Sequence, residues 1–471
     1  AYAEWVLGAS RQAMAPYVIT SLDDETKGLF ARCPWSDDFG GRVAFLDLAG
    51  RQATWTCDRA EFIGRNGALS APAGLARGVE LSGRTGGGLD PCGALAGTLD
   101  LAPGETTRVV VFLGQAADET SARELIVRYR AADPDALLAD VRRQWDDILG
   151  TLVVKTPDRA LDIMLNRWLL YQTLACRVWA RSGFYQAGGA YGFRDQLQDV
   201  MALMVARPGL ARGHLLRAAQ RQFPEGDVQH WWHPPTGKGV RTRISDDLLF
   251  LPYVAAHYVR ATGDAAVLDE VVPFLDGPVL EEGQHETYFE PKVSADGATL
   301  YEHCARAIDK SLGTGAHGLP LMGTGDWNDG MNLVGQAGKG ESVWLAWFLI
   351  ANLEGFAPTA EGRGEVDRAR SWRAHARALK EAVEREAWDG EWYRRAFFDD
   401  GAPIGSSTSL ECQIDSIAQS WGVLSGAADP ARSERAMASL ERLLVRREEG
   451  LVLLLTPPFD RSARSPGYIM G

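Results

Sequence analysis

The sequence predicts a multidomain α+β fold, in which an N-terminal antiparallel β-sandwich is joined by a helical linker to an α/α toroid. Two observations support this division. Short apolar runs between glycine, proline and aspartate clusters fill the first 117 residues, whereas apolar residues recur every three or four positions after them. The predicted domains are therefore 1–117 for the sandwich, 118–156 for the linker and 157–471 for the toroid.

The strands of the sandwich are predicted where apolar residues cluster between turn signals. Residues 17–20, 42–48 and 106–113 have the length and composition of strands. The last run gives the clearest signal, because it is rich in valine and follows the turn sequence Pro-Gly-Glu at 103–105. Several short strands at this spacing are typical of two packed sheets.

Helices follow from residue 118 onward. Within the linker, 121–130 and 133–149 have helical spacing, and Asp133-Pro134-Asp135 is a helix start signal. Long loops rich in glycine, proline, tryptophan and histidine separate the later helices, and such loops are typical of functional segments. The toroid helices are predicted at 160–180, 195–206, 210–222, 247–262, 265–275, 300–310, 341–353, 367–386, 415–424 and 429–444.

Composition excludes several classes of function. The 49 basic and 62 acidic residues give a net charge of −13, so the chain has no broad basic surface for nucleic acid or anionic lipid. No run of apolar residues is long enough to span a membrane. The six cysteines are widely spaced without a CxxC pair, which predicts buried, reduced thiols. A neutral or small-molecule substrate fits this balance best.

The densest group of polar and aromatic residues is the loop 323–332. It places two carboxylates, Asp326 and Asp329, three residues apart with Trp327 between them. An indole face suits the apolar C–H face of a sugar, while a carboxyl group can bind hydroxyls or deliver a proton. A carboxyl group shielded by Trp327 is expected to have a raised pKa, as a general acid requires. The residues leave open which aspartate acts, and equally a structural role in helix caps and Asx turns.

A second group, 184–199, runs from a glycine-rich aromatic loop containing Tyr191 into a predicted helix. Asp195 and Asp199 lie four residues apart on one face of that helix, beside Arg194. Their like charges favour a cation or a hydroxylated ligand as a partner. An ordinary helix cap with Arg194 as its counter-ion is the alternative.

A third group, 227–247, combines aromatic residues with arginines. Trp231, Trp232 and Arg243 are typical of carbohydrate subsites, although residues 245–247 could equally form a plain helix cap. His230 and His233 are three residues apart and lack a third ligand in the sequence, so no metal site is predicted.

Five stretches, occurring in one order, together resemble glycoside hydrolase family 94, the inverting β-glucoside phosphorylases. The opening 4–8 and the closing 455–460 look like the branch that contains 1,2-β-oligoglucan phosphorylases and the C-terminal region of cyclic β-1,2-glucan synthases. The resemblance covers nearly the whole chain. The five stretches are 166–172 (Asn-Arg-Trp-Leu-Leu-Tyr-Gln), 184–199, 241–249, 325–332 and 413–421.

The resemblance implies a β-sandwich, a helical linker and an (α/α)6 barrel. It also implies that Asp329 is the general acid, that Trp327 shapes the sugar site, and that Arg194 and Asp199 hold hydroxyls of the transferred glucosyl ring. Taken with the groups above, the predicted substrate-binding residues are Arg194, Asp199, Trp327, Tyr191, Asp195, Trp232 and Arg243.

The activity that the resemblance implies is reversible, inverting phosphorolysis of β-1,2-linked glucooligosaccharides to α-glucose 1-phosphate. Such an enzyme needs an acid but no base, because phosphate is itself an anionic nucleophile. Phosphate is then a co-substrate, and no cofactor or metal is expected. In the resembling family the phosphate-binding histidine and threonine follow the position of Gly471, so we expect a fragment that is truncated at both ends, with its barrel incomplete.

The expected partners are a β-glucan oligosaccharide and phosphate, without nucleic acid and without a membrane segment in this chain. Relatives are often dimers, which makes a homodimer a further expectation. The expected location is the cytoplasm, or else the cytoplasmic-side or periplasmic portion of an inner-membrane synthase.

Two other functions remain open from the sequence. One is an inverting hydrolase on the same barrel, with Asp415 or Glu411 as the base that activates water. The other is a non-catalytic glucan-binding module that controls chain length within a cyclic β-1,2-glucan synthase.

Overall fold

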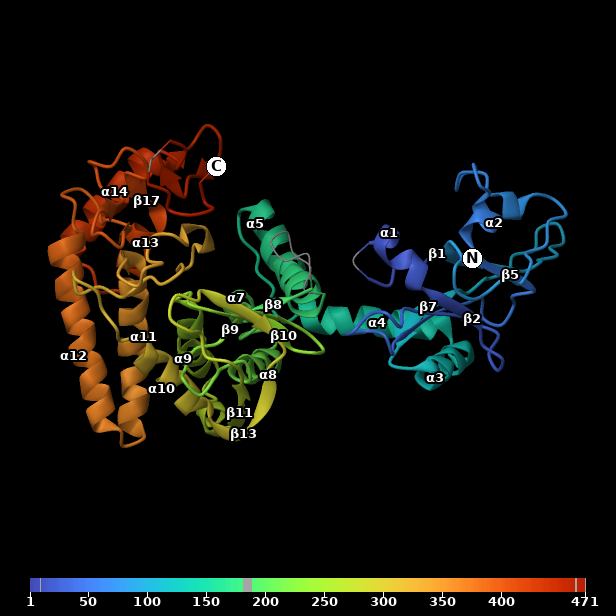
Figure 1. The fold of residues 1–471 in the computed structure, drawn as a ribbon, viewed down its shortest axis with the longest axis horizontal. Coiled ribbons are helices and arrows are strands. Elements are labelled where there is room, and N and C mark those ends of the chain that lie inside the picture. The colour runs from blue at the N-terminus through green and yellow to red at the C-terminus, as the bar shows by residue number, and fades with distance from the viewer. Residues whose placement is uncertain (9, 181–188, 462–463, 471) are drawn as a thin grey trace. The chain divides into compact units, whose positions relative to one another are not determined.

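The computed structural model describes residues 1–8, 10–180, 189–461 and 464–470. The chain divides into two compact units, Ala1–Trp145 and Asp146–Gly471. The first unit is dominated by β-strands and the second by helices, and both can be followed along the chain in Figure 1. The mixed fold predicted from the sequence is therefore confirmed at this level.

The first unit contains two antiparallel sheets. One has the strand order β1-β6-β5 and the other β2-β3-β4-β7. Helices α3 and α4 follow the last strand. The strands are β1 (Tyr2–Glu4), β2 (Ile19–Leu22), β3 (Leu29–Arg32), β4 (Val43–Asp47), β5 (Thr54–Asp58), β6 (Pro91–Ala96) and β7 (Phe112–Ala116), and the helices are α1 (Arg11–Met14), α2 (Arg59–Ile63), α3 (Glu119–Ala131) and α4 (Pro134–Leu149).

Helix α3 is held on the four-stranded sheet by apolar packing and by ion pairs. Ile126 is buried in one cluster with strand residues that include Phe45. Arg130 donates two hydrogen bonds, of 2.9 and 2.6 Å, to the buried carboxylate of Asp47 on β4. The Asp118 carboxylate caps the helix by accepting a hydrogen bond from the Ser121 amide. The predicted start of the helical segment at Asp118 is thus explained by a helix cap.

The second unit is built mainly from helices. Figure 1 shows α11 and α12 as its two longest helices, running side by side. The helices are α5 (Arg159–Ile163), α6 (Leu169–Gln172), α7 (Phe193–Met201), α8 (Pro208–Ala219), α9 (Phe250–Thr262), α10 (Leu300–Lys310), α11 (Val343–Gly362), α12 (Val366–Ala382), α13 (Ser416–Leu424) and α14 (Pro430–Leu444), with the π-helical turns η3 (Met164–Trp168) and η4 (Thr173–Trp179) on either side of α6.

The helices of this unit form two sets. The odd-numbered helices α7, α9, α11 and α13 contact one another in chain order. Helices α8 and α10 each contact the two odd-numbered helices beside them, while α12 contacts α11 and α14 contacts α13. Helix α11 lies deepest, since every residue from 343 to 350 is buried. The second unit is thus a domain of packed helices, while the α/α toroid stays a prediction.

The second unit also contains short strands between its helices, and the sequence analysis did not predict them. The largest group is a four-stranded sheet of order β12-β10-β9-β8, made of β8 (Tyr191–Gly192), β9 (Gln229–His233), β10 (Lys238–Thr242) and β12 (Glu286–Phe289). The remaining short strands are β11 (Val271–Asp276), β13 (Lys292–Thr299), β14 (Glu341–Ser342), β15 (Ala396–Phe397), β16 (Pro403–Ile404), β17 (Ile414–Asp415), β18 (Val445–Arg446), β19 (Leu451–Val452) and β20 (Leu455–Thr456).

Two predicted elements are wrong. Residues 265–275 were expected to form one helix, but a short 3-10 helix (Ala265–Asp269) is followed by β11, which pairs with β13. Pairing with a distant strand overrides the local helical spacing there. The strand expected at 106–113 begins only at Phe112, because β4 pairs with residues 112–116 and the valine-rich run before them has no partner strand.

Ile126 and Val127 allow a test of this packing at neighbouring positions of α3. Ile126 is fully buried against the sheet, whereas Val127 is 59% exposed. We expect Ile126→Ala to lower the free energy of unfolding of the first unit by about 2–5 kcal/mol, because it leaves a cavity. Val127→Ala is expected to change it by less than about 0.5 kcal/mol. Urea unfolding followed by circular dichroism measures both, and equal losses would contradict the packing described.

Candidate active site

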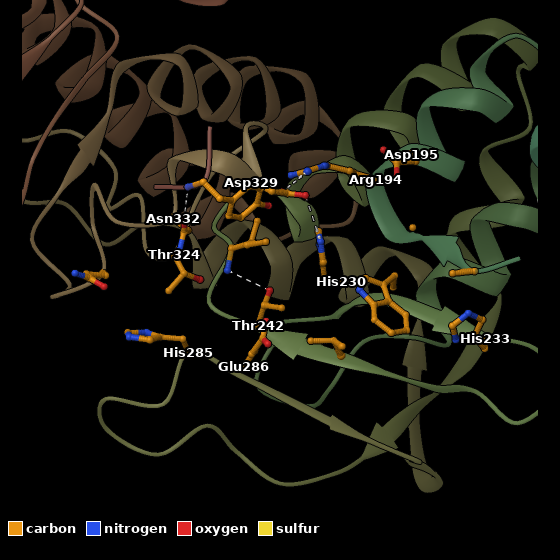
Figure 2. Close-up of a pocket in the computed structure, with 17 residues that line it drawn as sticks. Arg194, Asp195, His230, His233, Thr242, His285, Glu286, Thr324, Asp329 and Asn332 are labelled. Atoms are coloured by element: carbon orange, nitrogen blue, oxygen red, sulfur yellow. Dashed lines mark hydrogen bonds and ion pairs between the residues drawn. The ribbon is translucent and has the colours of Figure 1, made fainter. Parts of the chain in front are cut away.

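A cavity of about 1030 Å³ opens in the second unit beside the β8–β12 sheet. Its wall combines strand residues, the first turn of α7, the loop 323–332 and the C-terminal segment. Figure 2 shows the polar side chains of these elements converging on it. The residues that line it are Ala190, Gly192, Arg194, Asp195, His230, Trp231, His233, Val240, Thr242, Ile244, His285, Glu286, Thr324, Asp329, Asn332, Gln336 and Tyr468.

The loop 323–332 is fixed from its N-terminal side by the segment that precedes α9. The Ser245 amide and hydroxyl both donate to the Gly325 carbonyl, at 3.0 and 3.1 Å. Gly323 has a φ of +61°, and a Cβ there would lie 2.1 Å from the carbonyl oxygen of Arg243. Glycine is therefore required at this close backbone approach.

Asp326 anchors the loop and does not line the cavity. Its carboxylate accepts two hydrogen bonds of 2.6 Å from the Arg395 guanidinium and one of 2.7 Å from Ser342. Both side chains of the ion pair are fully buried. Burial would raise the pKa of Asp326, but the charge of Arg395 outweighs it and lowers the pKa. The group is a buried structural ion pair, so the tertiary structure separates the two aspartates that the sequence left equivalent.

Asp329 begins a short 3-10 turn, Asp329–Met331, and its side chain lines the cavity while remaining 33% exposed. One carboxylate oxygen lies 2.5 Å from the Arg194 guanidinium, and the other lies 3.6 Å from Nε2 of His230. Burial would raise the pKa of Asp329, but the interaction with His230 and the charge of Arg194 lower it.

The low pKa of Asp329 reverses the sequence-based expectation of a raised pKa. That expectation assumed shielding by Trp327, whose side chain is instead 40% exposed and does not line the cavity. Two cationic neighbours from distant parts of the chain, Arg194 and His230, decide the ionisation of Asp329. In the absence of substrate its carboxyl group is therefore an anion at neutral pH.

Arg194 is the centre of a buried cluster of charges. Its guanidinium lies 2.9 Å from Asp246 and 3.8 Å from Asp247, in addition to Asp329. Burial raises the pKa of Asp246 well above its usual range, and the neighbouring Asp247 adds to this while Arg194 opposes it. Burial likewise raises the pKa of Asp195, against the opposing charge of Arg194. Clusters with such perturbed ionisation are typical of functional sites.

His230 joins this cluster from strand β9. Its Nδ1 lies 2.8 Å from a carboxylate oxygen of Asp247, and Figure 2 shows its ring directed at Asp329. Burial would lower the pKa of His230, but the charges of Asp247 and Asp329 raise it to about 10. The imidazole is therefore protonated at neutral pH, and it supplies a second cation beside Asp329.

The other predicted binding residues do not line this cavity. Asp199 forms an ion pair with Arg177 at 2.8 Å, and burial raises its pKa to about 6. The hydroxyl of Tyr191 donates to the Val178 carbonyl at 3.2 Å, and Trp232 is only 1% exposed because it packs in the core. Arg243 donates to three backbone carbonyls of the segment 280–284. Local spacing could not show which way these side chains point.

Several residues that line the cavity carried no recognisable signal in the sequence. The C-terminal segment docks on the loop 323–332, because the Ile469 amide donates to the Gly330 carbonyl at 2.8 Å and the Leu333 amide donates to the Pro466 carbonyl at 3.0 Å. This docking brings Tyr468 to the cavity from more than a hundred residues away. Only tertiary contacts could have identified it. Residues 184–188 of the second sequence group lie outside the described residues.

The carboxylates named for a hydrolytic base are not at this cavity. Asp415 is buried and caps α13 by accepting a hydrogen bond of 2.9 Å from the Ile417 amide. Glu411 accepts a hydrogen bond of 3.1 Å from the Asp460 amide. Among the described residues, no group of three or more metal-binding side chains could hold a metal ion, and no helix there is long and apolar enough to cross a membrane.

Comparison with known families finds two matches that together cover nearly the whole chain. Residues 1–132 match the supersandwich domain of glycosyl hydrolase 94, and residues 144–471 match the catalytic domain of the Glycosyl hydrolase 94 superfamily. A bacterial glucoamylase bound to acarbose has a similar fold, with a TM-score of 0.56 and 11% identity over 91% of this chain and 60% of the glucoamylase chain.

Three curated relatives are similar in sequence. The cyclic beta-(1,2)-glucan synthase NdvB of Rhizobium meliloti is 49% identical over 99% of this chain, which spans 17% of that protein. Solabiose phosphorylase of Paenibacillus borealis is 33% identical over 87% of this chain and 50% of its own length. The 3-O-beta-D-glucopyranosyl-beta-D-glucuronide phosphorylase of the same organism is 30% identical over 83% of this chain and 48% of its own length. The chain thus spans half or less of each relative.

The different settings of the two loop aspartates lead to a stability prediction. We expect Asp326→Asn to lower the free energy of unfolding by about 3–5 kcal/mol, because it leaves the buried Arg395 without its main counter-ion. Asp329→Asn is the matched control and is expected to cost much less, because that side chain is partly exposed and has other acidic groups around it. Urea unfolding of both variants checks this, and an equal or larger loss for Asp329→Asn would contradict the assignment.

Proposed function

The chain belongs to the glycosyl hydrolase 94 superfamily, and we propose that it carries out reversible, inverting phosphorolysis of β-1,2-linked glucooligosaccharides to α-glucose 1-phosphate. One observation carries the proposal. Asp329, but not Asp326, faces a large cavity beside two cationic groups. An acid together with local positive charge is what a phosphorylase requires.

The proposed step follows from the placement of Asp329. Hydrogen phosphate attacks the anomeric carbon from the face opposite the glycosidic oxygen, and the carbon–oxygen bond to the rest of the glucan breaks. Asp329 delivers a proton to the departing oxygen. Inversion gives α-glucose 1-phosphate and a glucan shortened by one unit, and synthesis is the same step in reverse. Arg194 orients the Asp329 carboxylate through a charge-assisted hydrogen bond.

The size and lining of the cavity support an oligosaccharide substrate. Its volume of about 1030 Å³ is at the upper end of the range of roughly 300–1,000 Å³ for small-molecule sites. The half-buried Trp231 lines it and lies beside Tyr288, with ring centroids 5.7 Å apart, which offers an apolar face to a sugar ring. We propose that Asp195 binds sugar hydroxyls, whereas the side chains of Tyr191, Asp199, Trp232, Arg243 and Trp327 support or flank the site from outside the cavity.

The β-1,2 linkage is proposed from similarity alone. The relative that is 49% identical is described as a cyclic beta-(1,2)-glucan synthase, whereas the two phosphorylases named above are more distant. The same match favours a second candidate function, namely a glucan-binding module that sets chain length within a larger synthase.

Phosphate dependence tests the main proposal. We expect release of glucose 1-phosphate from β-1,2-glucooligosaccharides only when phosphate is present. Asp329→Asn is expected to lower kcat by about 10²–10⁴-fold, because the departing oxygen then receives no proton. The matched control is Asp296→Asn, an exposed position on β13 away from the cavity. Free glucose released without phosphate would instead identify a hydrolase.

Binding without turnover would identify the second candidate. In that case calorimetry detects β-1,2-glucooligosaccharides binding to the wild-type chain and to Asp329→Asn alike, while neither protein forms glucose 1-phosphate with phosphate present. Turnover by the wild-type chain would contradict a purely binding role.

A further inference from the structure

The proposed acid requires a source for its proton, because Asp329 is ionised in the structure without substrate. Resting on the proposed function, we propose that His230 is a positioning residue that stores this proton and returns it to Asp329 in each catalytic cycle. Asp247, His230 and Asp329 together form the relay. The three residues come from different elements, so neither the sequence groups nor the proposed acid alone reveals the relay.

The two ring nitrogens of His230 face different carboxylates, Asp247 on one side and Asp329 on the other. Asp247 is buried and accepts the Nδ1 proton of His230 at 2.8 Å, which fixes the orientation of the ring. The opposite nitrogen, Nε2, then faces the free oxygen of Asp329 at 3.6 Å. The other oxygen of Asp329 is occupied by Arg194. Within the described residues, His230 is therefore the proton donor that faces the second oxygen of Asp329.

The surrounding charges hold the proton on His230 when no substrate is bound. Asp247 and Asp329 face the imidazole directly and raise its pKa to about 10. Arg194 lies 3.8 Å from Asp247 and 2.5 Å from Asp329, and its charge lowers the pKa of Asp329. The other titratable groups around the cluster are Asp195 on α7, Asp246 beside Asp247, and Tyr468 near Asp329.

Substrate binding would reverse this preference. A sugar that fills the cavity removes water from Asp329 and His230, and loss of water disfavours the charged form of each group. Desolvation therefore raises the proton affinity of the carboxylate and lowers that of the imidazole. The proton can then pass from Nε2 of His230 to the nearby oxygen of Asp329, across a gap that needs to close by less than 1 Å to reach about 2.8 Å.

The protons balance over one turnover. The Asp329 proton passes to the glycosidic oxygen as its bond to the anomeric carbon breaks. A phosphate oxygen forms the new bond to that carbon, and hydrogen phosphate gives up its proton as glucose 1-phosphate dianion is made. His230, which has protonated Asp329, recovers one proton through solvent. No oxidant, metal or further reactant is required, and the reverse reaction uses the same steps.

The first test measures where the proton resides and does not depend on activity. ¹⁵N NMR of the histidine-labelled chain, with the His230 signal assigned by its loss in His230→Asn, follows the imidazole between about pH 5 and 10. We expect an imidazolium at neutral pH and a fall of more than one unit in its pKa in Asp329→Asn. Titration of His230 near its ordinary value of about 6.5, or no response to Asp329→Asn, would overturn the proposal.

The second test separates proton delivery from a structural role. With a β-1,2-glucooligosaccharide, His230→Asn is expected to lower kcat about 10²-fold, with little change in the KM for phosphate, and to move the alkaline limb of the pH profile to lower pH. With an aryl β-glucoside, whose leaving group needs no proton, it is expected to retain most of its rate. His257→Asn, on α9 and away from the cavity, is the matched control.

The outcomes distinguish the two proposals. An equal loss of rate with both substrates would show that His230 only supports the fold, and would overturn the relay. A wild-type chain that forms no glucose 1-phosphate would contradict the proposed function, while the NMR titration would still decide whether His230 and Asp329 share a proton.

Discussion

The candidate site depends on one buried ion pair, between Asp326 and Arg395. Two hydrogen bonds of 2.6 Å join them, and the hydroxyl of Ser342, which also caps helix α11, completes the group. A fully buried carboxylate is stable only when it is paired and hydrogen-bonded in this way. The Ser342 hydroxyl ties the loop to the start of α11, and the ion pair holds Asp326 in the core, away from the cavity that Asp329 lines.

Once the loop is fixed, the ionisation of the site follows from its neighbours. Arg194 and His230 bring positive charge to Asp329. Asp247 lies 3.8 Å from Arg194 and 2.8 Å from His230, and Asp246 lies 2.9 Å from Arg194. Such crowding of buried charges costs stability, since each must be removed from water. Such a cluster at the wall of a large cavity is typical of functional sites.

The sequence could predict the site only where local patterns coincide with tertiary contacts. Asp329, Arg194 and Asp195 line the cavity as their groups suggested, because a glycine-flanked loop and a helix N-terminus both lie at its wall. Tyr191 and Trp232 also come from the predicted groups, but both are buried and do not line the cavity. For Trp232, alternation along strand β9 decides this, since Trp231 and His233 on either side of it line the cavity. The strand itself was not predicted, so its alternation could not be used.

By itself, the sequence determined the order of a β-rich unit and a helical unit, the change of period near Asp118, most of the helices, and the family, because these depend on local spacing and on motifs of consecutive residues. The tertiary structure decided that Asp326 is the buried aspartate of the loop, which cations set the ionisation of Asp329, and how Tyr468 reaches the cavity. The physical reason is that burial, ion pairing and pKa depend on neighbours in space. Arg395, His230 and the C-terminal segment are neighbours of one loop only after the chain has folded.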